Sequence, residues 1–375
     1  MEQLPRSRRL FVGTYTDGGA SEGIYVLAFN EFERSLRVEH AGTHAPNPSF
    51  LVRSGSALYV AHELSDRSCL AVYSVADDGS LACRGACSSP ADAGTCFVAA
   101  HPNRRCLYGA NYESGSVGLC LLTADGNPCG GLPSVRHVGS GPNRARQSAP
   151  HVHSASFVPG TALLAVADLG CDTVTLYRAE ATGALEMPPV ETVRVPAGSG
   201  PRMLAFHPRL PLAGLVNELA DDVLLLRFDR AGRHWEQIGC LELPTAPGKR
   251  GALNGSSDTV GATQDDTTAA SERTVLAAHP AFSPDGRHLY VSVRGSDRIA
   301  LFNFDANGNA SLQADYSSGG RGPRHFSLSP AGDHLAVANQ DSGEVVLFAL
   351  DAVSGALQGE ARIAVPQPSC VVWES

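Results

Sequence analysis

The stretch SPDGRHLYVSVR at residues 283–294 contains the pattern that decides the fold: a Pro-Asp-Gly turn, then a short apolar strand that ends on a charged residue. Strands with similar four-residue ends recur along the chain. The seven copies are VGTY at 12–15, VAHE at 60–63, GANY at 109–112, VADL at 166–169, LVNE at 215–218, VSVR at 291–294 and VANQ at 337–340. Their first residues lie 48, 49, 57, 49, 76 and 46 positions apart. A repeat of this length points to a repeated unit of structure.

The longest interval contains a segment of different composition. Residues 245–273 are rich in Ser, Thr, Gly, Ala and Asp and contain no aromatic residue. Such a segment buries too little apolar area to offset the entropy that it would lose on ordering. Removing about 28 residues from the interval of 76 leaves about 48, the usual period. We therefore predict a flexible, low-complexity insertion at about 245–273 within a single domain that spans residues 1–375.

Each period contains several short strand candidates. VTLYRAEATGAL at 174–185 and IALFNFDANGNASL at 299–312 both consist of a strand, a turn with Gly and a second strand, which is typical of a hairpin. Four short strands in a period of about 40–50 residues are typical of one propeller blade. Seven copies therefore predict an all-β, seven-bladed β-propeller with four-stranded antiparallel blades. A pair of β-sandwiches is the alternative, but seven similar periods disfavour it.

The two ends of the chain predict how the ring closes. RSRRLFVGTYT at 6–16 and QPSCVVWES at 367–375 together resemble an interior stretch of one repeat. We expect the N- and C-terminal strands to pair within one blade, because closure removes exposed strand edges.

Composition and charge limit the partners. The chain has 375 residues, of which 43% are hydrophobic, and a formal net charge of -9. The acidic balance argues against nucleic acid and anionic membranes as main partners. The chain has no apolar run long enough for a membrane span and none of signal-peptide type at its start. We expect a cytoplasmic protein, and we favour a monomer.

The ten cysteines form no CxxC pair. Several of them lie in apolar runs, namely Cys69, Cys96, Cys106, Cys120 and Cys370. We predict reduced, mostly buried thiols, as is usual in the cytoplasm.

Two rings of side chains are candidates for a functional site. We interpret the repeated strands as those that line the central channel, so that equivalent positions gather around one axis. The fourth positions of the seven copies are Tyr15, Glu63, Tyr112, Leu169, Glu218, Arg294 and Gln340. The loops that enter these strands contribute a second set, Ser49, Cys96, His153, Arg202, Arg324 and Ser369, with His151, His279 and His325 close by. Arg, His and Glu at a channel mouth suggest an anion site with an acid or base.

Other chemistries have weaker support. The HxH pair at 151–153 is a weak metal signal, and the chain contains no HExxH motif, so we predict no metal site. No GxxxxGK[ST] or GxGxxG follows a strand, and no GxSxG elbow occurs.

The chain resembles the lactonase family of seven-bladed propellers, which includes 6-phosphogluconolactonases and fungal carboxy-muconate lactonizing enzymes. The similar segments run in order through nearly the whole chain outside 245–273. They include LFVGTYTDGGASEGIYV at 10–26, GANYESGSV at 109–117, RQSAPHVHS at 146–154, GSGPRMLAFHP at 198–208 and SPDGRHLYVSVR at 283–294.

The resemblance implies a set of catalytic residues. In the fungal enzymes a His, an Arg, a Glu and a second Arg are proposed for catalysis, and the matching positions here are His153, Arg202, Glu218 and Arg294. His151 is the alternative to His153 as the base. Substrate-binding candidates are His151, Arg324, His325, Tyr15, Glu63, Tyr112 and Gln340.

The implied activity is hydrolysis of 6-phospho-D-glucono-1,5-lactone to 6-phosphogluconate, a step of the pentose phosphate pathway, with no metal or organic cofactor. Arginines would bind the anion and the developing oxyanion, and His153 with Glu218 would activate water. Two positions depart from the family pattern: Met203 replaces a His, and Val293 replaces the Asn of an SNR motif. The alternatives are therefore an enzyme that hydrolyses or forms another acidic, muconolactone-like lactone, or a propeller that only binds.

Overall fold

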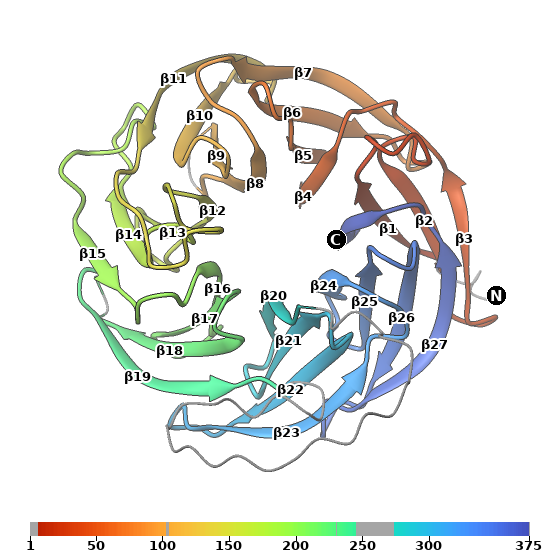
Figure 1. The fold of residues 1–375 in the computed structure, drawn as a ribbon. Helices are drawn as coiled ribbons and strands as arrows, with labels where there is room; N and C mark the ends of the chain where they lie inside the picture. The colour runs from red at the N-terminus through yellow and green to blue at the C-terminus, as the bar shows by residue number, and fades with distance from the viewer. Residues whose placement is uncertain (1–6, 103–104, 230, 245–273, 375) are drawn as a thin grey trace, which may run out of the picture.

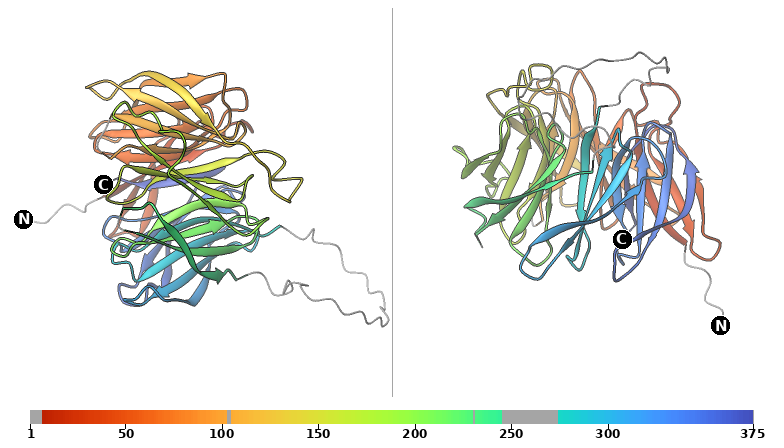
Figure 2. Two further views of the ribbon diagram at one scale, coloured as in Figure 1. Left: turned by 90° about the vertical axis from the view of Figure 1, so that its left-hand side faces the viewer. Right: turned by 60° about the horizontal axis from the view of Figure 1, so that its bottom comes forward.

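The structure is a computed structural model that describes residues 7–102, 105–229, 231–244 and 274–374. These residues form seven four-stranded antiparallel sheets that stand around a central axis (Figure 1). In side view the ring is a squat cylinder (Figure 2). The prediction of a seven-bladed β-propeller is therefore confirmed. The segment 245–273, predicted as an insertion, lies outside the described residues.

The blades share one order of strands from the channel outward. Blade 1 consists of β28 and β1–β3, and blades 2 to 7 follow as β4–β7 through β24–β27. The innermost strands are β4 (Pro48–Ser54), β8 (Thr95–Ala100), β12 (Val152–Phe157), β16 (Pro201–Phe206), β20 (Leu276–Phe282), β24 (Pro323–Leu328) and β28 (Pro368–Trp373). The second strands are β1 (Ser7–Thr14), β5 (Ala57–His62), β9 (Cys106–Asn111), β13 (Leu163–Asp168), β17 (Leu212–Asn217), β21 (His288–Arg294) and β25 (His334–Asn339).

The outer half of each blade is more exposed. The third strands are β2 (Tyr25–Asn30), β6 (Ser68–Val75), β10 (Ser116–Leu122), β14 (Thr173–Arg178), β18 (Asp222–Phe228), β22 (Arg298–Phe304) and β26 (Glu344–Leu350). The outermost strands are β3 (Ser35–His40), β7 (Leu81–Ser89), β11 (Pro128–Arg136), β15 (Glu191–Arg194), β19 (Trp235–Glu242), β23 (Ala310–Ser317) and β27 (Leu357–Ala364).

The ring closes as the two ends of the chain predicted. β28 pairs antiparallel with β1, and Leu10 lies opposite Trp373 in the register. Blade 1 therefore takes its innermost strand from the end of the chain and its other strands from the start. Closure in this way pairs the terminal strand within a blade instead of leaving it as an exposed edge.

The repeated strands are the second strands of the blades, so our interpretation of them as the innermost strands was wrong. β13, β17 and β25 are buried along their whole length. A second strand is covered on both faces by neighbouring blades, so its sequence is a continuous apolar run and stands out. The innermost strands precede these runs and have more varied sequences.

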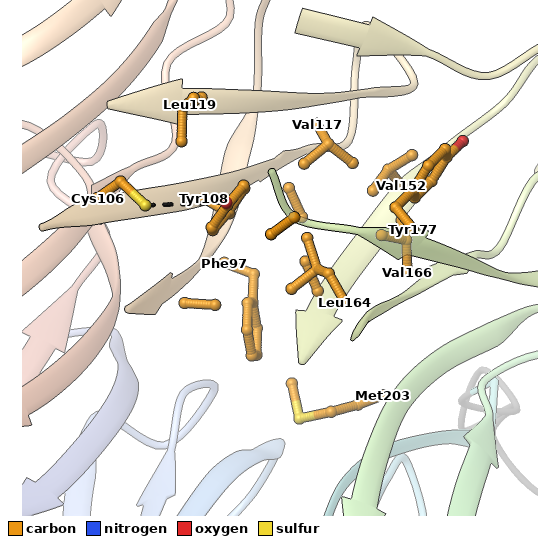
Figure 3. Packing of buried hydrophobic residues seen from close by; sticks show 14 residues of the cluster. Phe97, Cys106, Tyr108, Val117, Leu119, Val152, Leu164, Val166, Tyr177 and Met203 are labelled. Atoms are coloured by element: carbon orange, nitrogen blue, oxygen red, sulfur yellow. Dashed lines mark hydrogen bonds between the residues drawn. The ribbon is translucent and has the colours of Figure 1, made fainter. Parts of the chain in front are cut away.

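The hydrophobic core consists of clusters between neighbouring blades. The described residues form seven such clusters, which matches the seven blade interfaces. Figure 3 shows the cluster between blades 3 and 4, in which Phe97, Tyr108 and Val166 pack together. Met203 of blade 5 reaches into the same cluster. Each blade is therefore held by its neighbours, and the ring depends on closure.

The cysteines differ from the prediction of ten reduced and mostly buried thiols. Cys87 on β7 and Cys120 on β10 are joined in a disulfide between blades 2 and 3. They are 33 positions apart in sequence, and only the packing of the two blades brings their Cα atoms to 5.7 Å, within the usual range for a disulfide. Among the free cysteines, Cys83, Cys129 and Cys240 are exposed, because they lie on the outermost strands.

The part of the chain that the structure describes contains no helix long and apolar enough to cross a membrane.

Candidate active site

A β-bulge lies near the start of every innermost strand. In β16, for example, Pro201 pairs with Asn217 and Met203 pairs with Val216, so Arg202 is an extra residue between two ladder pairs. By the same count, the extra residues in the other strands are Ser49, Cys96, His153, Arg324 and Ser369, and in β20 one of Ala278 and His279. A bulge redirects a side chain away from the normal alternation of a strand.

The bulge residues of six blades converge on one small pocket. Its lining contains Ser49, Cys96, His153, Arg202, Arg324 and Ser369, together with Phe50, Met203 and His325. Its volume is about 10 Å³, close to the minimum that one water molecule needs. The sequence grouped the same six residues but placed them in loops. They lie within the innermost strands, because the bulge keeps the strand going while it turns one side chain inward.

Residues that follow the second strands lie at the same face of the ring, because the start of an innermost strand is antiparallel to the end of its neighbour. Glu218 follows β17, and the residue is 3% exposed. Oε2 of Glu218 accepts from Nε of Arg202 at 2.8 Å and lies 2.9 Å from Nη2 of Arg294. Oε1 of Glu218 accepts from Nη2 of Arg146 at 2.6 Å. One carboxylate therefore faces three guanidinium groups.

The arginines control the ionisation of this cluster. Burial alone would raise the pKa of Glu218, but Arg294 and Arg202 hold it well below its usual range, so the carboxylate stays ionised. Burial lowers the pKa of Arg294 to about 10, which still leaves it charged at neutral pH. Nη2 of Arg294 pairs with Glu218, whereas its Nε is buried without a hydrogen bond to another described residue. Nε is therefore an unsatisfied donor beside the carboxylate.

A second polar group stands beside the first. The hydroxyl of Tyr15 donates to Oε2 of Glu63 at 2.6 Å and accepts from Nη2 of Arg324 at 2.6 Å. Arg324 also lies close enough to Glu218 for their charges to interact. The two groups together contain four arginines and two glutamates, a surplus of two positive charges.

Asp221, beside the first group, interacts with both Glu218 and Arg294. Burial raises the pKa of its carboxyl to about 6. With this carboxylate ionised, the named groups still have a surplus of one positive charge, which suits an anionic ligand.

The histidines near the channel differ in their surroundings. His153 is 6% exposed and lines the pocket beside Arg202. Burial and the charge of Arg202 hold its pKa well below the usual value, so the imidazole is neutral. His151 lies outside the pocket lining. It stacks on Tyr112, and its Nδ1 is 3.0 Å from the carbonyl oxygen of Tyr112.

Two further histidines, His279 and His325, lie side by side next to the pocket. The rings of His279 and His325 are 3.9 Å apart between centroids, and His325 also contacts the edge of Phe50. Burial lowers the pKa of both, that of His325 to about 3. His325 therefore lines the pocket as a neutral ring.

The remaining predicted residues lie around the mouth. Tyr112 is half-buried, and its hydroxyl is 3.4 Å from Nη2 of Arg146. Gln340 is half-buried at the start of the turn after β25, and its backbone amide donates to the carbonyl of Gly322. Of the two departures from the family pattern, Met203 lines the pocket, whereas Val293 is buried in the core between blades 5 and 6. Only the first therefore changes the site.

Sequence reasoning missed Arg146. It precedes β12 in a long loop, outside both rings of equivalent positions. Its neighbour Gln147 is fully buried and donates to the carbonyl of Leu169 and to Oδ1 of Asp172. The only signal was its place at the start of the RQSAPHVHS segment.

Comparison with known proteins identifies the family. The profile of "Lactonase, 7-bladed beta-propeller" matches residues 9–373. The chain belongs to the lactonase family. The 6-phosphogluconolactonase of Bacillus subtilis (strain 168) is 28% identical over 327 residues, which cover 84% of this chain and 83% of that protein.

Solved structures agree with this assignment to the lactonase family. A periplasmic gluconolactonase of Pseudomonas aeruginosa has a TM-score of 0.86 and 27% identity, and the match covers 99% of each chain. A putative 6-phosphogluconolactonase of Bacteroides fragilis NCTC 9343 has a TM-score of 0.83 and 27% identity, and the match covers 98% of each chain. This lactonase is therefore similar to lactone-hydrolysing proteins over its whole propeller.

Proposed function

We propose that this lactonase hydrolyses 6-phospho-D-glucono-1,5-lactone to 6-phosphogluconate in the cytoplasm, a step of the pentose phosphate pathway. The observation that carries the proposal is the surplus of positive charge at the channel mouth. A phosphorylated lactone brings a dianionic phosphate and an ester carbonyl, and arginines bind phosphate bidentately and stay charged. The relationship to the Bacillus subtilis 6-phosphogluconolactonase supports this substrate.

The proposed reaction begins with one water molecule. The pocket beside His153 has room for about one water. The neutral imidazole takes a proton from that water as its oxygen attacks the lactone carbonyl. Arg202 and Arg294 stabilise the oxyanion that forms. The ring C–O bond then breaks, the leaving oxygen takes the proton back from His153, and the products are a carboxylic acid and a hydroxyl group.

Substrate charge would strengthen the base. Burial is the larger cause of the low pKa of His153, and the positive charge of Arg202 adds to it. An anion bound to the arginines offsets that charge, so the pKa of His153 rises towards the range useful for a base. Glu218, held between the guanidiniums, keeps them in position and shares the charge of the protonated imidazole.

The test is lactone hydrolysis with the substrate generated in the assay. Its loss is followed against the spontaneous rate, for wild type and for Arg294→Lys, which keeps the charge but loses the guanidinium fork. We expect wild type to accelerate hydrolysis well above background and the variant to lose most of that acceleration. A well-folded wild-type protein without acceleration would contradict the proposed substrate.

A second candidate is another acidic lactone that lacks phosphate. Met203 favours it, because an apolar side chain lines the pocket where the family usually has a histidine. A panel of phosphorylated and carboxylated lactones separates the two candidates by their kcat/KM values. Higher kcat/KM for a carboxylated lactone would favour the second.

A further inference from the structure

Arg146 differs from the other two arginines that face Glu218. Its side chain is 35% exposed, whereas that of Arg202 is 4% and that of Arg294 is 17% exposed. Arg202 is also anchored by a second strong bond, from Nη1 to the carbonyl of Ala278 at 2.8 Å. The second contact of Arg146 is the 3.4 Å approach to the hydroxyl of Tyr112. Arg146 is thus the most exposed guanidinium of the cluster, and Glu218 is its one close partner among the described residues.

The backbone under Arg146 is firmly held. The amide of Arg146 donates to the side chain and the carbonyl of Asn143, and the amide of Gln147 donates to the same carbonyl at 2.6 Å. The side chain of Gln147 reaches the buried carboxylate of Asp172 at 2.7 Å. Asp172 also accepts from the amides of Gly198 and Gly200, in the loop that leads to Arg202. Any change of partner at Arg146 therefore involves its side chain while the loop stays in place.

The bond between Arg146 and Glu218 is replaceable. Glu218 keeps Arg202 and Arg294 if Arg146 leaves, so its charge remains compensated. Arg146 is partly exposed, so solvent screens this pair more than it screens the pairs of Glu218 with Arg202 and Arg294. A ligand anion at the mouth offers Arg146 a new partner with two or three acceptor oxygens, which suits the planar guanidinium. The exchange also frees Oε1 of Glu218 to accept a hydrogen bond from the substrate.

We propose that Arg146 is a substrate-binding residue that pairs with Glu218 in the free protein and moves to the anionic group of the substrate when it binds. The inference rests on the proposed function for the identity of the substrate, but only on the charge cluster for the binding of an anion. Arg146 sets the preference for phosphorylated over uncharged lactones.

The experiment compares Arg146→Gln with Arg144→Gln, which removes the same charge from an exposed position on the same loop. Binding of inorganic phosphate is measured by calorimetry, and KM and kcat are measured with 6-phosphogluconolactone and with uncharged D-glucono-1,5-lactone. We expect Arg146→Gln to weaken phosphate binding and to raise KM for the phosphorylated lactone. Both changes should be about 10- to 100-fold, the loss of affinity expected when one hydrogen bond to a charged group is removed. KM for the uncharged lactone should change by less than about twofold. Arg144→Gln should match wild type, and Arg146→Lys should recover part of the affinity.

Other outcomes would overturn the inference. If Arg146→Gln binds phosphate as tightly as wild type and loses only kcat, Arg146 positions Glu218 and does not bind the anion. Absence of phosphate binding by wild type would also overturn it. A third outcome separates the two proposals: wild type hydrolyses neither lactone but binds phosphate, and Arg146→Gln alone loses that binding. The proposed substrate is then wrong, and the role of Arg146 in binding the anion stands.

Discussion

At the scale of single residues, the site depends on which histidine faces the reacting atoms. His153 is a bulge residue, so it points into the pocket beside Arg202. His151 lies two positions earlier, where its ring stacks on Tyr112 and its Nδ1 meets a backbone carbonyl. The sequence left these two histidines as alternatives, and their surroundings favour His153 as the base.

The two histidines can be separated by matched substitutions. We expect His153→Gln to lower kcat by about 10²- to 10⁴-fold, the usual contribution of a general base. His151→Gln should keep most of kcat, because its ring lies outside the pocket lining. Steady-state kinetics of both variants, with circular dichroism to check folding, make the comparison. Larger loss of kcat in His151→Gln would reverse the assignment.

At the scale of elements, two loops that carry site residues share one anchor. Asp172 lies in the turn between β13 and β14 with a φ of 52°, and its side chain is buried. Its carboxylate accepts from Gln147 beside Arg146 and from Gly198 and Gly200 before Arg202. Asp172 therefore couples the positions of two arginines on different blades without touching the pocket itself.

Asp172→Asn tests this coupling. Asn tolerates a positive φ, so the turn remains possible. In asparagine, an amide nitrogen replaces one of the two carboxylate oxygens and cannot accept the hydrogen bonds made to that oxygen. At least one buried N–H donor then has no acceptor, which costs about 1–3 kcal/mol of unfolding free energy. We expect a lower midpoint in urea denaturation and a higher KM, whereas Asp66→Asn, at an exposed position, should change neither. A variant with wild-type stability and KM would show that the loops hold their positions without Asp172.

At the scale of the whole molecule, the ring buries several neutral histidines around its axis. The pKa values of His153, His279 and His325 are lowered by burial, that of His325 to about 3. In the unfolded chain these groups return to about 6.5. Below that pH the unfolded state binds more protons than the folded state, so the free energy of unfolding falls as the pH falls.

The expected effect is large because three groups act together. Each contributes at most about 1.4 kcal/mol per pH unit below about 6.5, so three contribute at most about 4 kcal/mol per unit. The carboxyl of Asp221, whose pKa is raised to about 6, binds a proton in the folded state and offsets part of this fall. Urea denaturation at pH 7.5, 6.5 and 5.5 should show stability that is nearly constant above 6.5 and falls below it. His279→Gln should reduce the slope, and the exposed His234→Gln should leave it unchanged. Stability that is flat down to pH 5 would contradict neutral burial of these histidines.

Sequence and structure agree most closely where a pattern is repeated. The four-residue strand ends predicted seven blades, and the chain ends predicted the pairing of β1 with β28. The six residues that the sequence grouped at equivalent positions before these strands are the six bulge residues that line the pocket. Equivalent positions of a ring meet around its axis, so a repeat in sequence becomes a cluster in space.

By itself, therefore, the sequence determined the number of blades, the closure of the ring and most of the polar residues at its mouth, because all of these follow from periodic patterns. Only the tertiary structure decided that the repeated strands lie second from the channel, that bulges turn six side chains inward, and that Cys87 meets Cys120 across two blades. It also decided that Arg146 joins Glu218, 72 positions away. These features depend on contacts between blades and on one irregular loop, and neither leaves a repeated pattern in the chain.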